Sequence, residues 1–300
     1  MLTIQNIKKM FNWYLYRIGQ IAEAISVAIK LCLINLFSRR QITTSKGPMV
    51  PIVSLTSYGK RVSTVFLTIE SIAQGQTLPQ RIILWLDDAK IFENLPSSLT
   101  RLQKRGLEVK LTKNYGPHTK YYPYLISEQN FTVPLVTADD DMLYGYKWLS
   151  ELHVAFLRNP DLIHCHRARV IKVKAEKLQP FATWEFANTE ELSALNYLEG
   201  VSGVIYPSKF LHLLKQAGEK FLTICPKNDD TWLNVNALRH GFRIKQIRKN
   251  STHYPNIPGT NSMGLMHQNL GARGDAQIAR TFSTMDISQL LLSLKDSHIH

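Results

Sequence analysis

The chain has 300 residues, of which 44% are hydrophobic and 20% charged, so it can bury a large core and extensive disorder is excluded for most of it. A formal net charge of +13 predicts an anionic partner, which is a phosphorylated substrate, a lipid headgroup or nucleic acid. The three cysteines, Cys32, Cys165 and Cys225, form no Cys-x-x-Cys pair, which argues against a disulfide framework or zinc site and indicates a reducing cytoplasm.

Residues 1–45 differ in character from the rest of the chain. Between residues 4 and 37 there is no proline, and apolar residues recur at helical spacing on a wide face that Glu23 and Lys30 interrupt. Basic residues flank this stretch, and aromatic residues lie near its start. We therefore predict a helix that lies in a membrane surface through residues 4–40. A membrane-spanning helix, a cleaved signal peptide and a helix packed on the core are the alternatives.

Polar residues from 41 to 48 predict a linker, and strand and helix patterns alternate after it. The predicted strands are 50–55, 81–86 and 107–111, and the predicted helices are 63–73 and 97–105. This alternation predicts a mainly parallel sheet, which binds ligands at the carboxyl ends of its strands. The polar residues after the three strands are Ser57, Tyr58, Lys60 and Arg61, then Asp87 and Asp88, then residues 114–120. We expect them to form one composite site.

The stretch 133–144 is an apolar run, typical of a buried strand, that ends at three adjacent carboxylates. Asp139, Asp140 and Asp141 repel one another unless a cation or backbone donors neutralise them. Residues two apart in an extended segment point to the same side. We therefore expect Asp139 and Asp141 to share one Mg²⁺ or Mn²⁺ ion while Asp140 turns away. A solvated acidic turn is the alternative.

The patterns in the middle of the chain predict a helix at 148–157 and one or two strands at 162–174. Histidines and basic residues alternate in the second of these stretches, which is typical of the solvent face of an edge strand, and we predict no zinc there. Residues 200–207 predict a glycine-bearing turn and a short apolar run, where a ligand can approach the backbone closely.

Residues 225–238 contain a second acidic pair, Asp229 and Asp230, at the start of a predicted helix that ends at Gly241. Asn228 and Asp229 are good N-cap residues. A helix start favours the ionised form of an aspartate, so one of the pair can cap the helix while the other faces a cavity as a base.

The segment 259–274 contains many Gly, Asn, Ser and Met residues together with His267. It is long enough to be a functional loop, which we expect to close over the site.

Four features, at residues 53–58, 84–88, 139–141 and 228–233, occur in this order and together resemble the GT-A type of nucleotide-sugar glycosyltransferase, especially bacterial enzymes that build surface polysaccharides. The resemblance covers residues 49–275. It implies an α/β fold, a GT-A-like Rossmann-type three-layer sandwich with a mainly parallel sheet. The expected division of the chain is an N-terminal helix and linker (1–45), a glycosyltransferase domain (46–285) and a C-terminal tail (286–300).

The resemblance also implies roles for individual residues. The donor would be held by Thr56, Ser57, Tyr58, Arg61, Asp87 or Asp88, Lys120 and Asp140. Asp139 and Asp141 match the Asp-x-Asp motif that holds Mn²⁺ or Mg²⁺ on the diphosphate, and His267 is a further candidate metal ligand. Asp230 matches the base that deprotonates the acceptor hydroxyl in inverting members, with Asp229 as the helix cap, although either of the two can be the base.

The expected function is the transfer of a sugar from a nucleotide-diphosphate donor to a saccharide or lipid-linked acceptor in surface polysaccharide or lipopolysaccharide synthesis. The expected location is the cytoplasmic side of the cell membrane, as a peripheral protein. A nucleotidyltransferase or other metal-dependent nucleoside-diphosphate enzyme is one alternative, and a non-enzymatic basic membrane-binding protein is another. No nucleic-acid partner is expected, because the basic residues are not interleaved with aromatic stacking platforms.

Overall fold

A seven-stranded sheet forms the centre of the computed structural model, which describes residues 4–260 and 271–297. The strands lie in the order β11-β5-β10-β4-β1-β2-β3. Their bounds are β1 Ile52–Thr56, β2 Arg81–Leu86, β3 Leu107–Leu111, β4 Leu135–Thr137, β5 Ile163–Cys165, β10 Val204–Tyr206 and β11 Ile244–Gln246. Strand β10 is antiparallel to β4 and β5, and the other neighbouring pairs are parallel. The predicted mainly parallel α/β sheet is confirmed.

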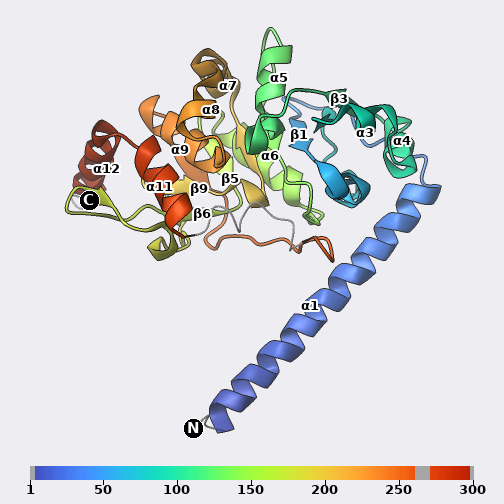
Figure 1. The fold of residues 1–300 in the computed structure, drawn as a ribbon, viewed down its shortest axis with the longest axis horizontal. Coiled ribbons are helices and arrows are strands. Elements are labelled where there is room, and N and C mark those ends of the chain that lie inside the picture. Colours follow the sequence, from blue (N-terminus) through green and yellow to red (C-terminus); the bar gives the residue numbers. More distant parts are fainter. Residues whose placement is uncertain (1–3, 261–270, 298–300) are drawn as a thin grey trace.

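Helices cover both faces of this sheet (Figure 1). The helices on one face are α2 (Val65–Ala73), α4 (Ser97–Gln103) and α6 (Trp148–Arg158). Those on the other are α5 (Tyr122–Ser127), α7 (Ser208–Ala217), α8 (Phe221–Ile224), α9 (Asp229–Arg239), α11 (Ala272–Thr281) and α12 (Thr284–Ser297). Side chains alternate between the two cores along each strand, so on β2 Ile82 and Leu84 face one core and Ile83 and Trp85 the other. The predicted three-layer sandwich is confirmed.

The first half of the domain follows the predicted alternation closely. Strands β2 and β3 have the predicted bounds, and β1 is shifted by one or two residues. Strands β1 and β2 are buried along nearly their whole length, because central parallel strands are covered on both faces. Their sequences are therefore continuous apolar runs, which made both strands predictable. The predicted helix at 63–73 begins with a 3₁₀ turn (Gly59–Ser63), and a short helix, α3 (Ala89–Glu93), lies where none was predicted.

The stretch 162–174 differs from its prediction. It forms three strands, β5, β6 (Ala168–Val170) and β7 (Val173–Lys174). Strand β6 pairs with β9 (Asn196–Leu198) and β7 with β8 (Lys177–Leu178), in two small antiparallel sheets. Strand β5 lies inside the main sheet, between β10 and β11, so the expectation of an edge strand is wrong.

The histidines of this stretch are buried rather than solvent-facing. Each forms a hydrogen bond between its Nε2 and a backbone carbonyl, His164 with Asn159 at 3.0 Å and His166 with Trp148 at 2.9 Å. Burial lowers the pKa of His166 to about 4, so this ring is neutral near pH 7. The core accepts each ring because its Nε2 finds a carbonyl partner there, although Nδ1 of both rings is buried without a hydrogen bond to the described residues.

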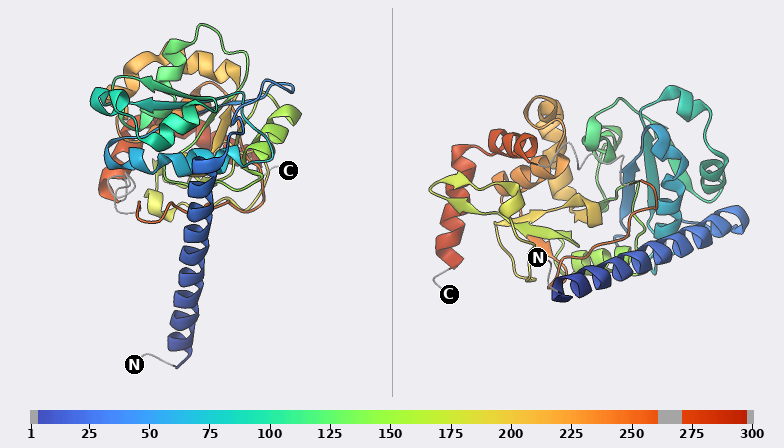
Figure 2. Two further views of the ribbon diagram at one scale, coloured as in Figure 1. Left: turned by 90° about the vertical axis from the view of Figure 1, so that its right-hand side faces the viewer. Right: turned by 60° about the horizontal axis from the view of Figure 1, so that its bottom comes forward.

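Helix α1 (Ile4–Phe37) confirms the predicted N-terminal helix, and its N-terminal part extends away from the sheet (Figures 1 and 2). Towards its C-terminal end it packs on α2 and α4 through buried Ala24 and Leu31, and Asn35 Nδ2 donates to Glu70 Oε1 at 2.9 Å. Its exposed large apolar residues include Met10, Phe11, Trp13, Ile18, Ile21, Ile25, Ile29, Leu33, Leu36 and Phe37. The segment 10–37 is long and apolar enough to cross a membrane, with a hydropathy of 1.6 and 17% of its most apolar window buried.

Two segments that the sequence places outside the domain are packed onto it. Ile42, in the predicted linker, is fully buried in a core cluster, and its N–H donates to Arg105 O at 2.9 Å. Helix α12 occupies the predicted tail; its Leu290 is fully buried, and Arg239 Nη2 donates to its Asp286 Oδ2 at 2.7 Å. Residues on both sides of the expected boundaries at 45 and 286 therefore contact the domain, and the division itself stays a prediction.

Candidate active site

A cavity of about 910 Å³ opens at the carboxyl ends of β1, β2 and β4, and the first turn of α9 forms part of its opposite wall. Strand β1 pairs in parallel with both neighbours, placing Thr56 opposite Trp85 and Ser54 opposite Thr137. Because the chain leaves all three strands at the same edge of the sheet, the polar residues that follow them converge. The cavity lies where the sequence predicts a composite site.

Ten of the predicted site residues line this cavity: Thr56, Tyr58, Arg61, Asp87, Lys120, Asp139, Asp140, Asp141, Asp229 and Asp230. Ser57 is buried behind the lining, where its Oγ donates to Asp140 Oδ2 at 2.6 Å. Asp88 instead caps helix α3, and its Oδ1 accepts the N–H groups of Lys90 at 2.8 Å and Ile91 at 3.2 Å. His267 lies outside the described residues, as does most of the expected loop at 259–274.

The acid triplet, Asp139 to Asp141, does not have the expected alternating geometry. Arg61 Nη2 lies 2.8 Å from Asp140 Oδ1 and 2.5 Å from Asp141 Oδ2, so these two neighbours share one guanidinium. Asp139 belongs to a different ion pair, with Lys120 Nζ 2.7 Å from its Oδ1. Strand β4 ends at Thr137 and the triplet follows in a turn, so the two-residue period of an extended strand does not apply to it.

Burial works against ionisation of two members of the triplet, Asp140 and Asp141. It raises the pKa of Asp140 to about 7, although the charge of Arg61 and the hydroxyl of Ser57 favour the carboxylate. Burial and the charge of Asp139 likewise raise the pKa of Asp141 above its usual range. A further cation in this part of the cavity would stabilise both carboxylates in their ionised form.

Lys120 joins the acid triplet to the acid pair, Asp229 and Asp230. Its Nζ lies 2.7 Å from Asp139 Oδ1 and 3.1 Å from Asp229 Oδ2. Its backbone carbonyl accepts the Oγ–H of buried Ser54 on β1 at 2.7 Å, which fixes the end of the 3₁₀ helix Gly116–Lys120 against the sheet. Burial opposes its charge, but the nearby carboxylates raise the pKa of Lys120 well above its usual value. Lys120 is therefore a fixed cation between the two acidic groups.

His118 attaches the same 3₁₀ helix to the segment that leads into α9. Its Nε2 lies 2.8 Å from Cys225 O, its Nδ1 lies 2.8 Å from Tyr121 Oη, and its ring stacks on Phe221. Burial lowers the pKa of His118 to about 4. A neutral ring that donates from Nε2 to the carbonyl and accepts the tyrosine proton at Nδ1 satisfies both contacts.

The acid pair lies in the first turn of α9, but the N-cap of this helix is Asn228 rather than Asp229, and Asn228 Oδ1 accepts the N–H of Thr231 at 2.9 Å. The expectation that Asp229 caps the helix is therefore wrong. Asp229 Oδ2 is buried without a hydrogen bond, and within the described part of the chain its charge is balanced through the ion pair with Lys120. Burial, followed by the charge of Asp229, raises the pKa of Asp230 well above its usual range.

Gly200 holds one oxygen of Asp230 in place. Its N–H donates to Asp230 Oδ1 at 2.9 Å. A Cβ at this position would lie only 2.7 Å from the same oxygen, so the close approach requires glycine. The glycine-bearing turn was expected to bring backbone close to a ligand, and the structure shows that it brings backbone close to a side chain of the cavity.

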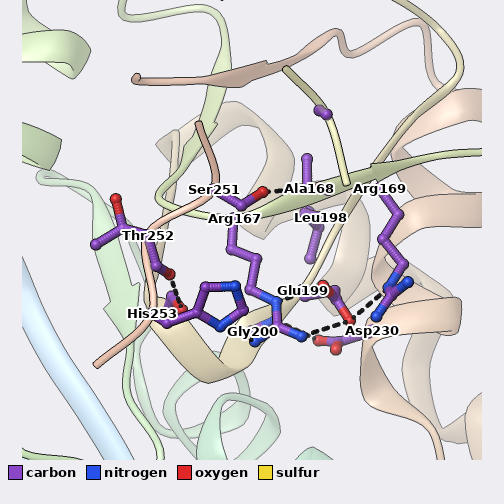
Figure 3. A network of polar contacts seen from close by, with 12 residues as sticks. Arg167, Ala168, Arg169, Leu198, Glu199, Gly200, Asp230, Ser251, Thr252 and His253 are labelled. Carbon is purple, nitrogen blue, oxygen red and sulfur yellow. Dashed lines mark hydrogen bonds and ion pairs between the residues drawn. The ribbon is translucent and has the colours of Figure 1, made fainter. Parts of the chain in front are cut away.

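One side of the cavity is formed by residues to which the sequence analysis gave no role. We call Arg167, Arg169, Glu199 and His253 the arginine wall (Figure 3). Both arginines bind Glu199, with Arg167 Nε 2.5 Å from its Oε2 and Arg169 Nε 3.1 Å from its Oε1. Of the four, Arg167, Glu199 and His253 line the cavity. The spacing of Arg167 and Arg169, two residues apart in an extended stretch, was the available signal that they share one side.

The lining of the cavity has an excess of negative charge. Seven of its described residues are acidic, Asp87, Asp139, Asp140, Asp141, Glu199, Asp229 and Asp230, and three carry a Lys or Arg charge, Arg61, Lys120 and Arg167. No group of three or more His, Cys, Asp or Glu in the described ranges is arranged to hold a metal ion. Mg²⁺ is commonly held by one or two carboxylates together with waters and substrate phosphates. Asp139 and Asp141 fit that partial set of ligands.

No family model and no curated protein matches the chain. Among solved structures, CMP:2-keto-3-deoxy-manno-octonic acid synthetase complexed with CTP is similar over 74% of this chain and 100% of its own, with 13% identity and a TM-score of 0.43. The fragment 1–349 of S. aureus TarS is similar over 69% of this chain and 59% of its own, with 15% identity and a TM-score of 0.45. The chain thus spans less than two thirds of that fragment. These similarities carry no inference about activity.

Proposed function

We propose that the protein is a metal-dependent GT-A-type glycosyltransferase that moves a sugar from a nucleotide-diphosphate donor to the hydroxyl of a saccharide or lipid-linked acceptor. The observation that carries this proposal is the junction at Lys120, where the acid triplet after β4 and the acid pair at the start of α9 face one cavity through a shared cation. One acidic group there suits a diphosphate and its metal ion, and the other suits an acceptor hydroxyl.

The donor is assigned to the side of the cavity formed by the ends of β1, β2 and β4. Thr56, Tyr58 and Asp87 line this side, and Asn114 Nδ2 donates to Asp87 Oδ2. Burial raises the pKa of Asp87 above its usual range. A half-buried polar edge of this kind offers hydrogen bonds to a nucleoside, while Arg61 and Lys120 supply the nearest positive charges for its phosphates.

Asp139 and Asp141 are the proposed ligands of Mn²⁺ or Mg²⁺. When bound, such an ion neutralises the charge that develops on the leaving diphosphate. The excess of carboxylates in the lining supports this assignment, because an anionic donor entering an acidic cavity requires additional positive charge. Lys120 remains paired with Asp139 and holds that carboxylate in position.

Asp230 is the proposed base. Its Oδ1 is held by Gly200 N–H, which leaves Oδ2 for the proton of the acceptor hydroxyl. A raised pKa makes this carboxylate a stronger base than an ordinary aspartate, and near neutral pH such a group is well matched to its task. Asp229 forms an ion pair with Lys120 next to Asp230, so its negative charge is partly neutralised there.

The test is donor binding and hydrolysis with UDP-, GDP- and CMP-sugars, with Mn²⁺ or Mg²⁺ and with excess EDTA. We expect binding to require the ion, and Asp139→Asn and Asp141→Asn to abolish it. Asp88→Asn is the matched control, because Asp88 caps α3 outside the lining and Asn caps a helix about as well as Asp. Equal donor affinity in EDTA would remove the metal from the proposal.

The products distinguish the alternative enzyme class. A glycosyltransferase releases a nucleoside phosphate and forms a new glycosidic bond. A nucleotidyltransferase joins a nucleotide to a sugar and releases pyrophosphate from a nucleoside triphosphate. The assay is therefore repeated with nucleoside triphosphates and free sugars, and pyrophosphate release there, with no sugar transfer from any of the nucleotide-sugar donors, would replace the proposed function with the second class.

We further propose that α1 attaches the protein to the cytoplasmic face of a membrane and lies in its surface. The exposed apolar side chains of α1, such as Ile18, Ile21 and Ile25, support this proposal, as do the flanking basic residues. Ala24 and Leu31 pack on the domain, and exposed apolar side chains of α1 lie both before residue 24 and after it, so both parts of the helix offer an apolar face to the lipid.

Removal of residues 1–20 tests the attachment without disturbing the packed end of α1. We expect the full chain, but not the truncated one, to sediment with vesicles of phosphatidylcholine and phosphatidylglycerol. In cell membranes, release of the full chain by alkaline carbonate would support a peripheral helix, and its retention would show a spanning one. Equal sedimentation of both chains would contradict any role for this segment.

A further inference from the structure

The arginine wall differs from the rest of the cavity in the sign of its charge. Two guanidinium groups share the single carboxylate of Glu199. In Figure 3 they approach Glu199 from either side, and Asp230 lies next to it. The two arginines and Glu199 sum to one net positive charge, whereas seven of the ten Asp, Glu, Lys and Arg residues in the described lining are acidic. Arg167 brings its guanidinium to the cavity surface, because it lines the cavity and Arg169 does not.

The polar atoms that Arg167 and His253 can offer to a ligand are hydrogen-bond donors. Arg167 has five N–H groups and uses three of them, two on Glu199 and one on His253 Nδ1 at 2.9 Å. Because His253 Nδ1 accepts this bond, the ring proton is on Nε2, which is a donor. Burial, followed by the charge of Arg167, lowers the pKa of His253, so its ring remains neutral.

The arginine wall is held by further contacts to the backbone and to aromatic rings. Arg169 Nη1 donates to Trp184 O at 2.7 Å, and its guanidinium lies 4.9 Å from the ring centre of Phe181. Phe181 and Tyr197 also line the cavity. Aromatic rings with a few fixed polar groups are typical of small-molecule sites, where the rings hold the apolar face of a ligand and the polar groups set its orientation.

The arginine wall also adjoins the proposed base. Glu199 is followed directly by Gly200, whose N–H holds Asp230 Oδ1 at 2.9 Å. The donor side of the cavity is formed by the other edge, at the ends of β1, β2 and β4. A sugar that presents a hydroxyl to Asp230 therefore has the arginine wall on its remaining side.

We propose that the arginine wall binds the acceptor, and that this acceptor is a saccharide carrying an oxyanion, either the carboxylate of an acidic sugar or a phosphate on the sugar. Arg167 forms a charge-assisted pair with the oxyanion, and His253 Nε2–H supplies a neutral hydrogen bond. The rings of Phe181 and Tyr197 contact the face of the sugar. This inference rests on the proposed glycosyltransferase function and names the substrate class of its acceptor side.

Direct binding tests the inference without any transfer reaction. The probes are methyl glucoside, methyl glucuronide and glucosyl phosphate, titrated into the full protein and followed by ligand-observed NMR. We expect one or both anionic probes to bind at least about tenfold more tightly than methyl glucoside, since a hydrogen bond to a charged group contributes about 1.5 to 3 kcal/mol. The anionic probe that binds more tightly shows whether the acceptor carries a carboxylate or a phosphate.

The variants are Arg167→Gln and Arg167→Lys. Arg167→Gln should remove the preference for anionic probes. Arg167→Lys, which keeps the positive charge, should retain part of that preference. Both should fold, because Arg169 remains paired with Glu199. Arg248→Gln is the matched control, because Arg248 is exposed, pairs with Glu151 and lies outside the cavity lining.

Equal affinity for the three probes, or an anion preference that survives in Arg167→Gln, would overturn the inference. Donor hydrolysis to water, measured in the same proteins without acceptor, separates the two proposals. Loss of the anion preference in Arg167→Gln, with donor hydrolysis present in the wild type and in Arg248→Gln, supports both. Absence of hydrolysis in the wild type would remove the proposed function, and the saccharide titration would still decide whether the arginine wall binds oxyanions.

Discussion

The acid triplet and the acid pair face the same cavity in opposite electrostatic settings. Arg61 contacts both Asp140 and Asp141, and Lys120 contacts Asp139, so each carboxylate of the triplet has a cation. Within the described ranges the acid pair has one cation in contact, Lys120 beside Asp229, and Asp230 accepts a neutral backbone N–H. Burial raises the pKa of Asp140, Asp141 and Asp230 alike, but only the first two have a cation in contact among the described residues, so Asp230 is the better suited of the three to take a proton.

Lys120→Met should have the largest effect, because it removes the cation that the two acidic groups share. Lys120 is buried, and loss of one partner from a buried ion pair costs about 3 to 5 kcal/mol by leaving carboxylates without compensation. We expect this loss in the free energy of unfolding measured with urea. Lys209→Met, at an exposed pair with Asp161, should change stability by less than about 0.5 kcal/mol. Similar losses in the two variants would contradict the role of Lys120.

Asp230→Asn should affect turnover rather than binding. Loss of a general base lowers the rate by about 10² to 10⁴, and donor affinity should stay nearly constant because the donor lies on the other side of the cavity. Asp229→Asn, measured alongside, should mainly lower the melting temperature, since Asp229 is the pair's contact with Lys120. A full rate in Asp230→Asn would exclude Asp230 as the base, and a dead Asp229→Asn enzyme with unchanged melting would assign the base to Asp229.

The pH profiles of the wild type and of Asp230→Asn sharpen the comparison. A base acts only when it is deprotonated, so transfer should fall as the pH drops through the raised pKa of Asp230. That fall should begin at a higher pH than for an ordinary aspartate, and the small residual rate of Asp230→Asn should lack it.

Gly200→Ala tests how accurately Asp230 must be positioned. The added Cβ would lie 2.7 Å from Asp230 Oδ1, so the carboxylate must move. A displacement of about 1 Å can lower the rate of an enzyme about 10²-fold. We expect a loss of that order in turnover, with donor affinity retained. Gly19→Ala is the control, since its Cβ meets nothing within 4 Å. Unchanged turnover in Gly200→Ala would show that the contact does not position the base.

The smallest effect is expected at His118, which connects the segments carrying Lys120 and the acid pair. Its pKa is lowered to about 4, so the unfolded chain binds a proton at higher pH than the folded one. Stability therefore falls as the pH drops from about 6.5 towards 4. Between about pH 7 and about pH 5.5 the wild type should lose about 1 kcal/mol more than His118→Gln, in urea unfolding at each pH. Equal losses would show that His118 does not contribute to this pH dependence.

Strands β1, β2 and β4 were predictable from sequence because they repeat a simple physical pattern. Continuous apolar runs such as Ile82–Leu86 are buried on both faces and are bounded by polar residues, so neither the strand nor the edge where it ends depends on distant contacts. The carboxylates that follow these strands therefore converge on one cavity, as the order of elements predicted.

The second half of the chain was less predictable because its residues depend on partners far away in sequence. His164 and His166 alternate as surface residues would, yet they are buried because β5 lies between β10 and β11 and two carbonyls accept the rings. Short strands of three residues contain too little pattern to show such a position.

The sequence by itself determined the class of fold, the N-terminal helix and the residues that line the cavity at the ends of β1, β2 and β4, because these follow from local apolar runs and from the polar residues directly after them. Only the tertiary structure decided how the charges pair. Arg61 joins Asp140 and Asp141, and Arg167 meets Glu199, across 79 or more and 32 positions of the chain respectively. Such ion pairs depend on which distant segments the folded sheet brings together, and a local sequence pattern does not predict those contacts.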